Sequence, residues 1–151
     1  MKKALIVLGF VFLLLIVLAA TCLAFVRIEG PRLDASSKAF VDRNIPILVS
    51  TWSWDEFQKR TSVEFQKVTS KQQWTLYLPK IKQLGKLESY EGCEGQSYTS
   101  LTFQNGLVVK ADYTANAEFQ KGSAEINVEL IRRKGLWQIS RLEVDSPLFL
   151  K

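Results

Sequence analysis

The chain has 151 residues, a formal net charge of +5 at pH 7 and no histidine. Its 20 basic residues form no dense stripe of lysine and arginine, so the composition argues against a nucleic-acid-binding protein. The lack of histidine removes the commonest general acid and base, the usual Ser–His and Cys–His catalytic pairs and the commonest metal ligand. We therefore expect no bound metal and no cofactor.

The N-terminus carries an uninterrupted apolar run from Ala4 to Val26, directly after Lys2 and Lys3. A helix rises about 1.5 Å per residue, so a run of about 23 residues spans about 35 Å, more than the hydrocarbon core of about 30 Å. The hydrophobic part of a signal peptide is usually only about 7–15 residues long. We therefore predict an uncleaved membrane anchor over residues 1–27. A signal peptide, or a lipoprotein cleaved before Cys22, is the alternative.

Lys2 and Lys3 predict a cytoplasmic N-terminus, because positive residues that flank a span stay inside. The prediction is a single-pass protein of a bacterial inner membrane, with residues 28–151 as one extracytoplasmic domain. Cleavage would instead leave a secreted or periplasmic domain. Cys22 would lie in the membrane, so Cys93 is expected to be an inert thiol. Its neighbours Glu88, Glu91 and Glu94 are irregularly spaced among glycines and predict a solvated loop.

The first part of the domain is predicted to be helical. Gly30 and Pro31 mark the expected end of the anchor helix. Residues 34–50 have apolar side chains on one side and predict a second helix, which Pro46 should kink or split. A short helical piece is expected over residues 62–68.

Two capping boxes are predicted in the same region. Ser53 with Glu56, and Ser70 with Gln73, have the spacing in which each side chain binds the other residue's backbone amide. The helix after Ser70 has an apolar face. We expect Pro79 to interrupt this helix and Gly85 to end it. The face consists of Trp74, Tyr77, Leu78 and Ile81.

Beyond Gly85 the hydrophobic period changes from 3.6 to 2, which predicts antiparallel strands. Strands are expected over residues 107–119, 124–130 and 137–144, the last with a β-bulge near Ser140. Glycines at positions 106, 122 and 135 mark hairpin-like turns, each with the residue before it. The predicted fold is α+β: a transmembrane helix, then helices packed on a curved antiparallel sheet of at least four strands.

Three segments of this part carry a family resemblance: residues 113–119 (YTANAEF), 122–126 (GSAEI) and 135–142 (GLWQISRL). Together they resemble the nuclear-transport-factor-2-like superfamily, and are similar to its small bacterial exported domains of unknown function. The resemblance covers residues 34–146. It implies a cone in which helices cross the concave face of the sheet and a pocket opens between them. Members include isomerases, dehydratases, binding modules and assembly modules, so the resemblance assigns no activity.

If the domain has the pocket that the resemblance implies, its aromatic residues are candidates for lining that pocket. The alternative is that they pack in the core. They are Trp52, Trp54, Phe57, Phe65, Trp74, Tyr77, Tyr98, Phe103, Tyr113, Phe119 and Trp137. Strand alternation turns Asp112 and Glu118 away from the apolar face, and no carboxylate is predicted beside Tyr77 or Tyr113. We therefore expect no catalytic residues.

The open face of the sheet is a second candidate site, this one for interaction with a protein or with another copy of the chain. Val108 and Ile131 are expected to project there beside Lys110 and Arg133, and mixed apolar and charged surfaces of this kind suit non-obligate interfaces. The sequence therefore predicts a membrane-tethered, non-catalytic module that binds a protein partner, itself or a small apolar ligand. The alternative is an isomerase- or dehydratase-like enzyme with its site in the pocket.

Overall fold

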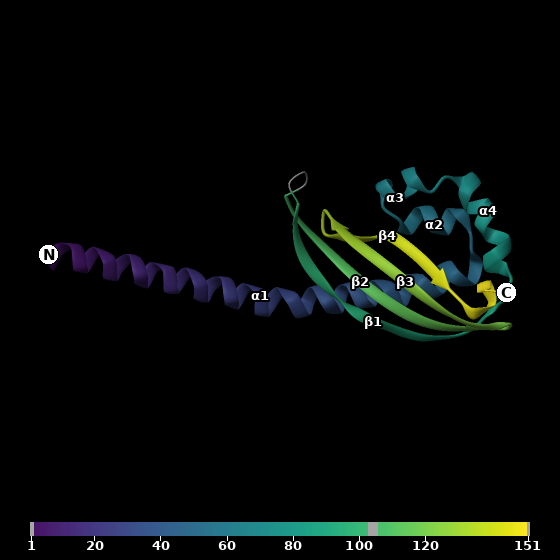
Figure 1. Cartoon of the computed structure of the whole chain (residues 1–151), viewed down its shortest axis with the longest axis horizontal. Helices are drawn as coiled ribbons and strands as arrows, with labels where there is room; N and C mark the ends of the chain where they lie inside the picture. Colours follow the sequence, from purple (N-terminus) through teal and green to yellow (C-terminus); the bar gives the residue numbers. More distant parts are fainter. Residues whose placement is uncertain (1, 103–105, 151) are drawn as a thin grey trace. The chain divides into compact units, whose positions relative to one another are not determined.

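The computed structural model describes residues 2–102 and 106–150, with the side chains of residues 9, 11–21, 30–100 and 106–150. The chain divides into two compact units, Met1–Leu33 and Asp34–Lys151. Helix α1 (Lys2–Thr51) contributes its first part to the first unit and its remainder to the second (Figure 1).

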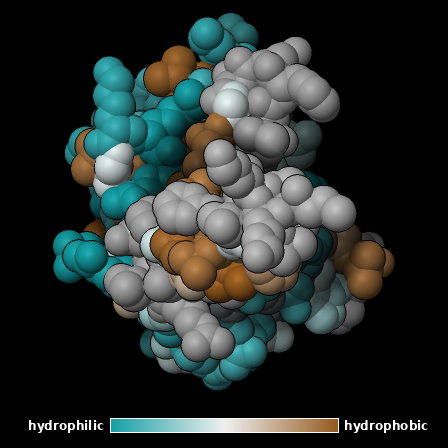
Figure 2. Space-filling model, turned by 90° about the vertical axis from the view of Figure 1, so that its left-hand side faces the viewer, coloured by the Kyte–Doolittle hydropathy of each residue, from teal (hydrophilic) through white to brown (hydrophobic). Residues whose placement is uncertain are grey.

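Residues 11–18 of the first unit are all apolar and expose between 49% and 66% of their surface. Hydrophobic residues that reach the surface are brown in Figure 2. In the described part of the chain, no helix has a stretch long and apolar enough to cross a membrane. Residues 4–8, 10 and 22–26 of the predicted anchor lie outside the described side chains, and this range includes Cys22.

The second unit is an α+β domain, in which a curved antiparallel sheet of four strands follows the helices (Figure 1). The strands pair in chain order, β1-β2-β3-β4. This confirms the predicted α+β fold with a four-stranded antiparallel sheet. After α1 the elements are α2 (Trp54–Arg60), α3 (Val63–Val68), α4 (Lys71–Lys82), β1 (Leu87–Thr102), β2 (Gly106–Phe119), β3 (Gly122–Arg133), β4 (Leu136–Asp145) and the short 3-10 helix η1 (Pro147–Leu150).

The core of the second unit lies between residues 34–51 of α1 and one face of the sheet. Trp137 donates a hydrogen bond from Nε1 to Ser36 Oγ over 3.0 Å, and the hydroxyls of Ser37 and Tyr113 lie 2.8 Å apart. The predicted core residues Tyr113, Ile126, Val128 and Trp137 are each at most 9% exposed, as expected. Beside them, α1 contributes Val41, Ile45, Leu48 and Val49, none more than 1% exposed.

The predicted helix end at Gly30 and Pro31, the split at Pro46 and the interruption at Pro79 are wrong. α1 continues through Gly30, Pro31 and Pro46, and α4 continues through Pro79. Proline inside a helix costs about 3 kcal/mol, because it lacks an amide hydrogen and crowds the preceding turn. Around Pro46, burial of Ile45 and Leu48 offsets this cost, since each such side chain contributes about 1.5–3 kcal/mol.

One of the two predicted capping boxes forms. Ser70 Oγ accepts a hydrogen bond from the backbone of Gln73, and the Gln73 side chain binds the backbone N–H of Ser70. Ser53 occupies the N-cap position of α2, but its side chain makes no capping hydrogen bond, so that prediction is wrong. Glu56 does not reach back to Ser53 because it pairs with Lys59 and Arg60.

The predicted bulge and the turn between β3 and β4 are present. Glu129 is opposite Arg141 and Leu130 is opposite Ile139, which leaves Ser140 as the extra residue. The backbone φ angles of Lys134 and Gly135 are 49° and 81°, the positive pair that a type I′ hairpin turn needs. Residue 105 of the first predicted turn lies outside the described residues.

The predicted loop around Cys93 is wrong, because these residues belong to strand β1, but Glu88, Glu91 and Glu94 are exposed to solvent as predicted. The register of β1 against β2 shifts between Leu87 and Ser89 and again between Tyr90 and Cys93. Because of these shifts, apolar and polar residues do not alternate regularly in this segment, and the sequence pattern does not indicate a strand. Cys93 is 4% exposed within it.

Candidate functional site

The second unit contains a mostly apolar cavity of about 310 Å³, which we call the aromatic cavity. Five elements (α2, α3, α4, β4 and η1) and two connecting residues surround it, so the chain must fold fully to form it. Its volume is at the lower end of the range of small-molecule sites, which is about 300–1,000 Å³. The lining residues are Trp52, Phe57, Phe65, Thr69, Trp74, Tyr77, Lys80, Ile81, Leu142, Val144 and Phe149.

Trp52 is held in the wall by an unusual backbone conformation. Its φ angle is +46° and its amide donates to the Leu48 carbonyl over 2.8 Å, which ends α1 with a left-handed residue. Glycine is the usual residue at such a helix end, and other residues cost about 1–2 kcal/mol there. The Trp52 ring stacks on Phe119 with 6.5 Å between the ring centroids and is 6% exposed. Strain of this kind at a cavity wall points to a functional position.

Phe57 is the centre of the aromatic packing behind the cavity. The centroid of its ring lies 4.6 Å from that of Trp74 and 5.2 Å from those of Trp54 and Phe65. Aromatic pairs at such distances contribute about 0.5–1.5 kcal/mol beyond their burial. The wall formed by α2, α3 and α4 is therefore fixed before any ligand arrives.

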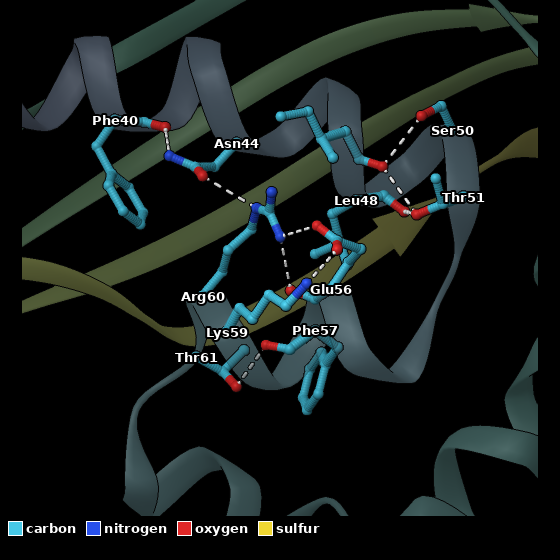
Figure 3. A network of polar contacts seen from close by, with 11 residues as sticks. Phe40, Asn44, Leu48, Ser50, Thr51, Glu56, Phe57, Lys59, Arg60 and Thr61 are labelled. Carbon is cyan, nitrogen blue, oxygen red and sulfur yellow. Dashed lines mark hydrogen bonds and ion pairs between the residues drawn. The ribbon is translucent and has the colours of Figure 1, made fainter.

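A polar network fixes α2 on α1. Figure 3 shows Arg60 reaching across from α2 to Asn44 of α1, where Nε donates to Oδ1 over 3.0 Å. Arg60 also donates to the Glu56 backbone carbonyl over 3.0 Å and pairs with the Glu56 carboxylate. Since Phe57 follows Glu56 directly, this network helps to place the Phe57 ring at the cavity.

Two indole N–H groups of the cavity wall have no partner. The Nε1 atoms of Trp52 and Trp74 are buried and make no hydrogen bond, and each residue is 6% exposed. Indole nitrogen can only donate, and a buried donor without a partner costs about 1–3 kcal/mol. The wall therefore has donor capacity that the described part of the protein leaves unused.

Lys80 is the one charged residue in the described lining of the cavity. Its Nζ lies 5.1 Å from the centroid of the Phe149 ring, and it forms no salt bridge with a described carboxylate. Lys80, Val144 and Phe149 also line a neighbouring groove of about 700 Å³, which we call the acidic groove. Its carboxylates are Glu91, Glu118, Glu125 and Asp145.

The structure places the predicted aromatic residues in three groups. Trp52, Phe57, Phe65, Trp74 and Tyr77 line the cavity. Trp54 and Phe119 lie against lining residues through the ring contacts described above. The others lie elsewhere. Tyr113 and Trp137 belong to the core beside α1, Tyr98 is 41% exposed, and Phe103 lies outside the described residues.

Sequence reasoning did not assign Lys80, Thr69, Leu142, Val144 or Phe149 to the site. Leu142 and Val144 carry a usable signal, because they continue the apolar face of the last strand beyond the bulge. Phe149 gives none, since its short 3-10 helix follows the sheet without any periodic pattern.

The predicted interaction residues on the open sheet face differ in exposure. Ile131 is 9% exposed, so it offers little surface to a partner. Lys110 and Gln138 lie opposite it on the neighbouring strands, where long side chains can cover it. Val108 and Lys110 are half-buried, and Arg133 pairs with Glu64 over 2.9 Å.

A polar cluster joins α1 to β1 away from the cavity. Tyr90 donates from its hydroxyl to Asp42 Oδ1 over 3.0 Å, and Lys38 Nζ binds Asp42 Oδ2 over 3.0 Å and the Cys93 carbonyl over 2.6 Å. Burial is the main cause that raises the pKa of Tyr90, and the nearby Cys93 and Asp42 add to it. Burial alone would raise the pKa of Asp42, but hydrogen bonds from Lys38, Cys93 and Tyr90 hold it below its ordinary value.

Asp42 and Tyr90 are within hydrogen-bonding distance, which is the geometry that proton transfer needs. Neither residue lines the aromatic cavity or the acidic groove. The raised pKa also keeps the Tyr90 hydroxyl protonated at neutral pH. The cluster is therefore suited to holding α1 on the sheet rather than to acting on a substrate.

No known family model, curated protein or solved structure matches the chain. What the aromatic cavity does must therefore be argued from its own chemistry.

Proposed function

We propose that this protein is a membrane-tethered, extracytoplasmic, non-catalytic module that binds a small apolar ligand. The observation that carries the proposal is the aromatic cavity, with a volume of about 310 Å³ and six aromatic lining residues. Concave, mostly apolar pockets with a few polar groups are the usual form of small-molecule sites.

The state of the cavity wall supports binding over plain packing. Trp52 adopts a strained backbone conformation beside the cavity, and the indole nitrogens of Trp52 and Trp74 have no partner. A core without a function would more often use glycine at the end of α1 and would pair its buried donors. The left-handed backbone at the end of α1 holds the Trp52 ring in the cavity wall, where it adds to the apolar binding surface.

The membrane tether rests on the apolar run from Ala4 to Val26 with Lys2 and Lys3 before it. The exposure of residues 11–18 supports it, because isolated apolar side chains on one helix gain from contact with lipid. Membership of the nuclear-transport-factor-2-like superfamily is part of the proposal and is supported by helices that precede a curved four-stranded sheet. The N-in orientation places the binding domain outside the cytoplasm.

An enzyme is less well supported. The described lining contains no carboxylate and no cysteine, and the chain has no histidine. Lys80 and Tyr77 are the lining groups able to exchange a proton, and Tyr77 is 63% exposed. Isomerase or dehydratase chemistry would need a second proton-transfer group beside one of them.

The test is calorimetric titration of the full-length protein in detergent with 1-decanol, an apolar probe without charge. We expect saturable binding to one site and a rise in the thermal midpoint, because a ligand that binds only the folded state stabilises it. Leu142→Trp should fill the cavity and weaken binding at least about tenfold. Leu136→Trp is the matched control, since Leu136 is on the same strand and 70% exposed.

Absence of saturable binding to the wild-type protein would overturn the proposal. So would equal affinity of the Leu142→Trp and Leu136→Trp variants, provided that both melt cooperatively.

A further inference from the structure

The charge distribution at the mouth of the aromatic cavity narrows the class of ligand. Resting on the function proposed above, we infer that the ligand is an anionic amphiphile: a carboxylate carried by a medium-length alkyl chain. The alkyl chain occupies the aromatic cavity and the carboxylate binds Lys80.

The first argument is the balance of donors and acceptors in the side chains of the lining. Lys80 only donates hydrogen bonds, and the described lining has no carboxylate or side-chain amide. The hydroxyls of Thr69 and Tyr77 can donate as well as accept. A ligand rich in acceptors fits this set, whereas an ammonium ligand finds no anionic side chain in it.

The second argument is the position of Lys80. Its ammonium lies 5.1 Å from the Phe149 ring centroid and forms no salt bridge with a described carboxylate. A carboxylate there would form a charge-assisted hydrogen bond, which is stronger than one between neutral groups. The aliphatic part of Lys80 meanwhile covers the apolar wall.

The third argument is size. A group as large as one water molecule takes about 30 Å³ in a liquid, so the cavity of about 310 Å³ has room for about ten heavy atoms. A decyl chain is therefore a suitable probe.

The acidic groove argues for the opposite charge on the head group of the ligand. It shares Lys80, Val144 and Phe149 with the aromatic cavity. A ligand whose head reached the groove would be cationic, since four carboxylates line it. Lys80 lines both the cavity and the groove, whereas these four carboxylates line only the groove. This favours an anionic head.

The experiment compares three probes of equal chain length: decanoate, 1-decanol and decylamine. Each is titrated calorimetrically at pH 7.5 and low salt into the full-length protein in detergent. We expect decanoate to bind about fivefold more tightly than 1-decanol, as for a solvent-accessible ion pair worth about 1 kcal/mol, and decylamine to bind most weakly. The preference should shrink as the salt concentration rises.

Lys80→Met keeps the apolar stem and removes the charge. It should abolish the preference for decanoate while the affinity for 1-decanol changes less than about twofold. Lys82→Met is the matched control, because Lys82 is exposed on the same helix and does not line the cavity.

The outcomes separate the two proposals. If no decyl probe binds, the proposed function fails. If all three probes bind equally, or if Lys80→Met leaves the preference intact, the function stands and the inference about the carboxylate is overturned. Tighter binding of decylamine would overturn it in favour of the acidic groove.

Discussion

Cys93 is a buried thiol whose surroundings suppress its chemistry. Burial, and secondarily the hydrogen bond and negative charge of Asp42, raise the pKa of Cys93 to about 11. The nearby Lys38 opposes this change without reversing it. A thiol with such a pKa is almost entirely protonated at neutral pH and is a poor nucleophile.

We predict that a thiol reagent at pH 7.5 will label Cys93 only when the protein unfolds. The pKa of Cys93 is higher in the folded than in the unfolded state, so the folded state holds its proton more tightly. Its contribution to stability is complete below about pH 9 and is lost as the pH rises towards 11. Relative to Cys93→Ala, the wild-type free energy of unfolding should fall by on the order of 2 kcal/mol over this range.

Chemical denaturation at several pH values measures this difference. Because Cys22 carries a second thiol, labelling is read by mass spectrometry of the peptide that contains Cys93. Rapid labelling of the folded protein, or a constant difference between the two proteins from pH 9 to 11, would contradict the prediction.

Gly95 is a residue at which side-chain size decides whether two strands can pair. A Cβ atom at Gly95 would lie 2.0 Å from the backbone oxygen of Asp112 and 2.8 Å from the Cα of Tyr113. We predict that Gly95→Ala lowers the free energy of unfolding by more than about 3 kcal/mol, because the obstacle is backbone that cannot move without separating β1 from β2.

Gly92→Ala is the control on the same strand. Gly92 has a φ angle of +91°, but a Cβ there would meet only an Asp42 oxygen at 4.0 Å. Its cost should therefore be limited to the backbone strain of about 1–2 kcal/mol. Equal thermal midpoints for the two variants would show that the close approach at Gly95 is wrong.

At the scale of elements, the caps of α2 and α4 form a natural pair for comparison. Ser70 Oγ accepts a hydrogen bond from Gln73 over 3.2 Å, whereas Ser53 makes no capping bond. We predict that Ser70→Ala costs about 1 kcal/mol and that Ser53→Ala costs less than about 0.5 kcal/mol. Urea denaturation of the two variants measures the difference. A larger loss for Ser53→Ala would mean that the sequence pattern at Ser53 and Glu56 was correct after all.

This pair also shows how far sequence reasoning reaches. A capping box can be recognised by spacing, but so can the pairing of Glu56 with Arg60 four residues further along the helix, and spacing does not show which of the two contacts forms. Long alternation in β2 and the bulge at Ser140 could be predicted because they are local patterns. Strand β1 could not, since its glycines and two register shifts remove the alternation.

The candidate site was predictable to a similar extent. The aromatic residues of α2, α3 and α4 stand out by residue type, and five of the predicted set line the cavity. Phe149 joins them only through tertiary structure, because η1 is separated from α4 by the whole sheet in the sequence, whereas Lys80 lies on α4 itself, one turn after Tyr77. Similarly, Pro46 lies inside a helix because burial of its neighbours Ile45 and Leu48 outweighs a local preference that the sequence alone expresses.

At the scale of the whole molecule, the proposal joins an N-terminal tether to a ligand-binding domain. In this proposal, the tether determines the compartment in which the ligand must be available, and the cavity determines which kind of ligand binds. The two parts can fail independently, because one depends on residues 1–27 and the other on the second unit alone.

The tether gives the last prediction. Lys2 and Lys3 should keep the N-terminus in the cytoplasm, so a reporter fused after Lys151 should lie outside it. We expect high alkaline phosphatase activity and no fluorescence from a green fluorescent protein at this position, and fractionation should place the full-length chain in the membrane.

Lys2→Glu with Lys3→Glu should reduce the phosphatase signal, because the orienting charge is reversed. Arg132→Glu with Arg133→Glu, within the domain, is the matched control and should leave the signal unchanged. Fluorescence at the C-terminus would refute the topology, whereas a soluble, shortened product would show that the segment is a cleaved signal peptide.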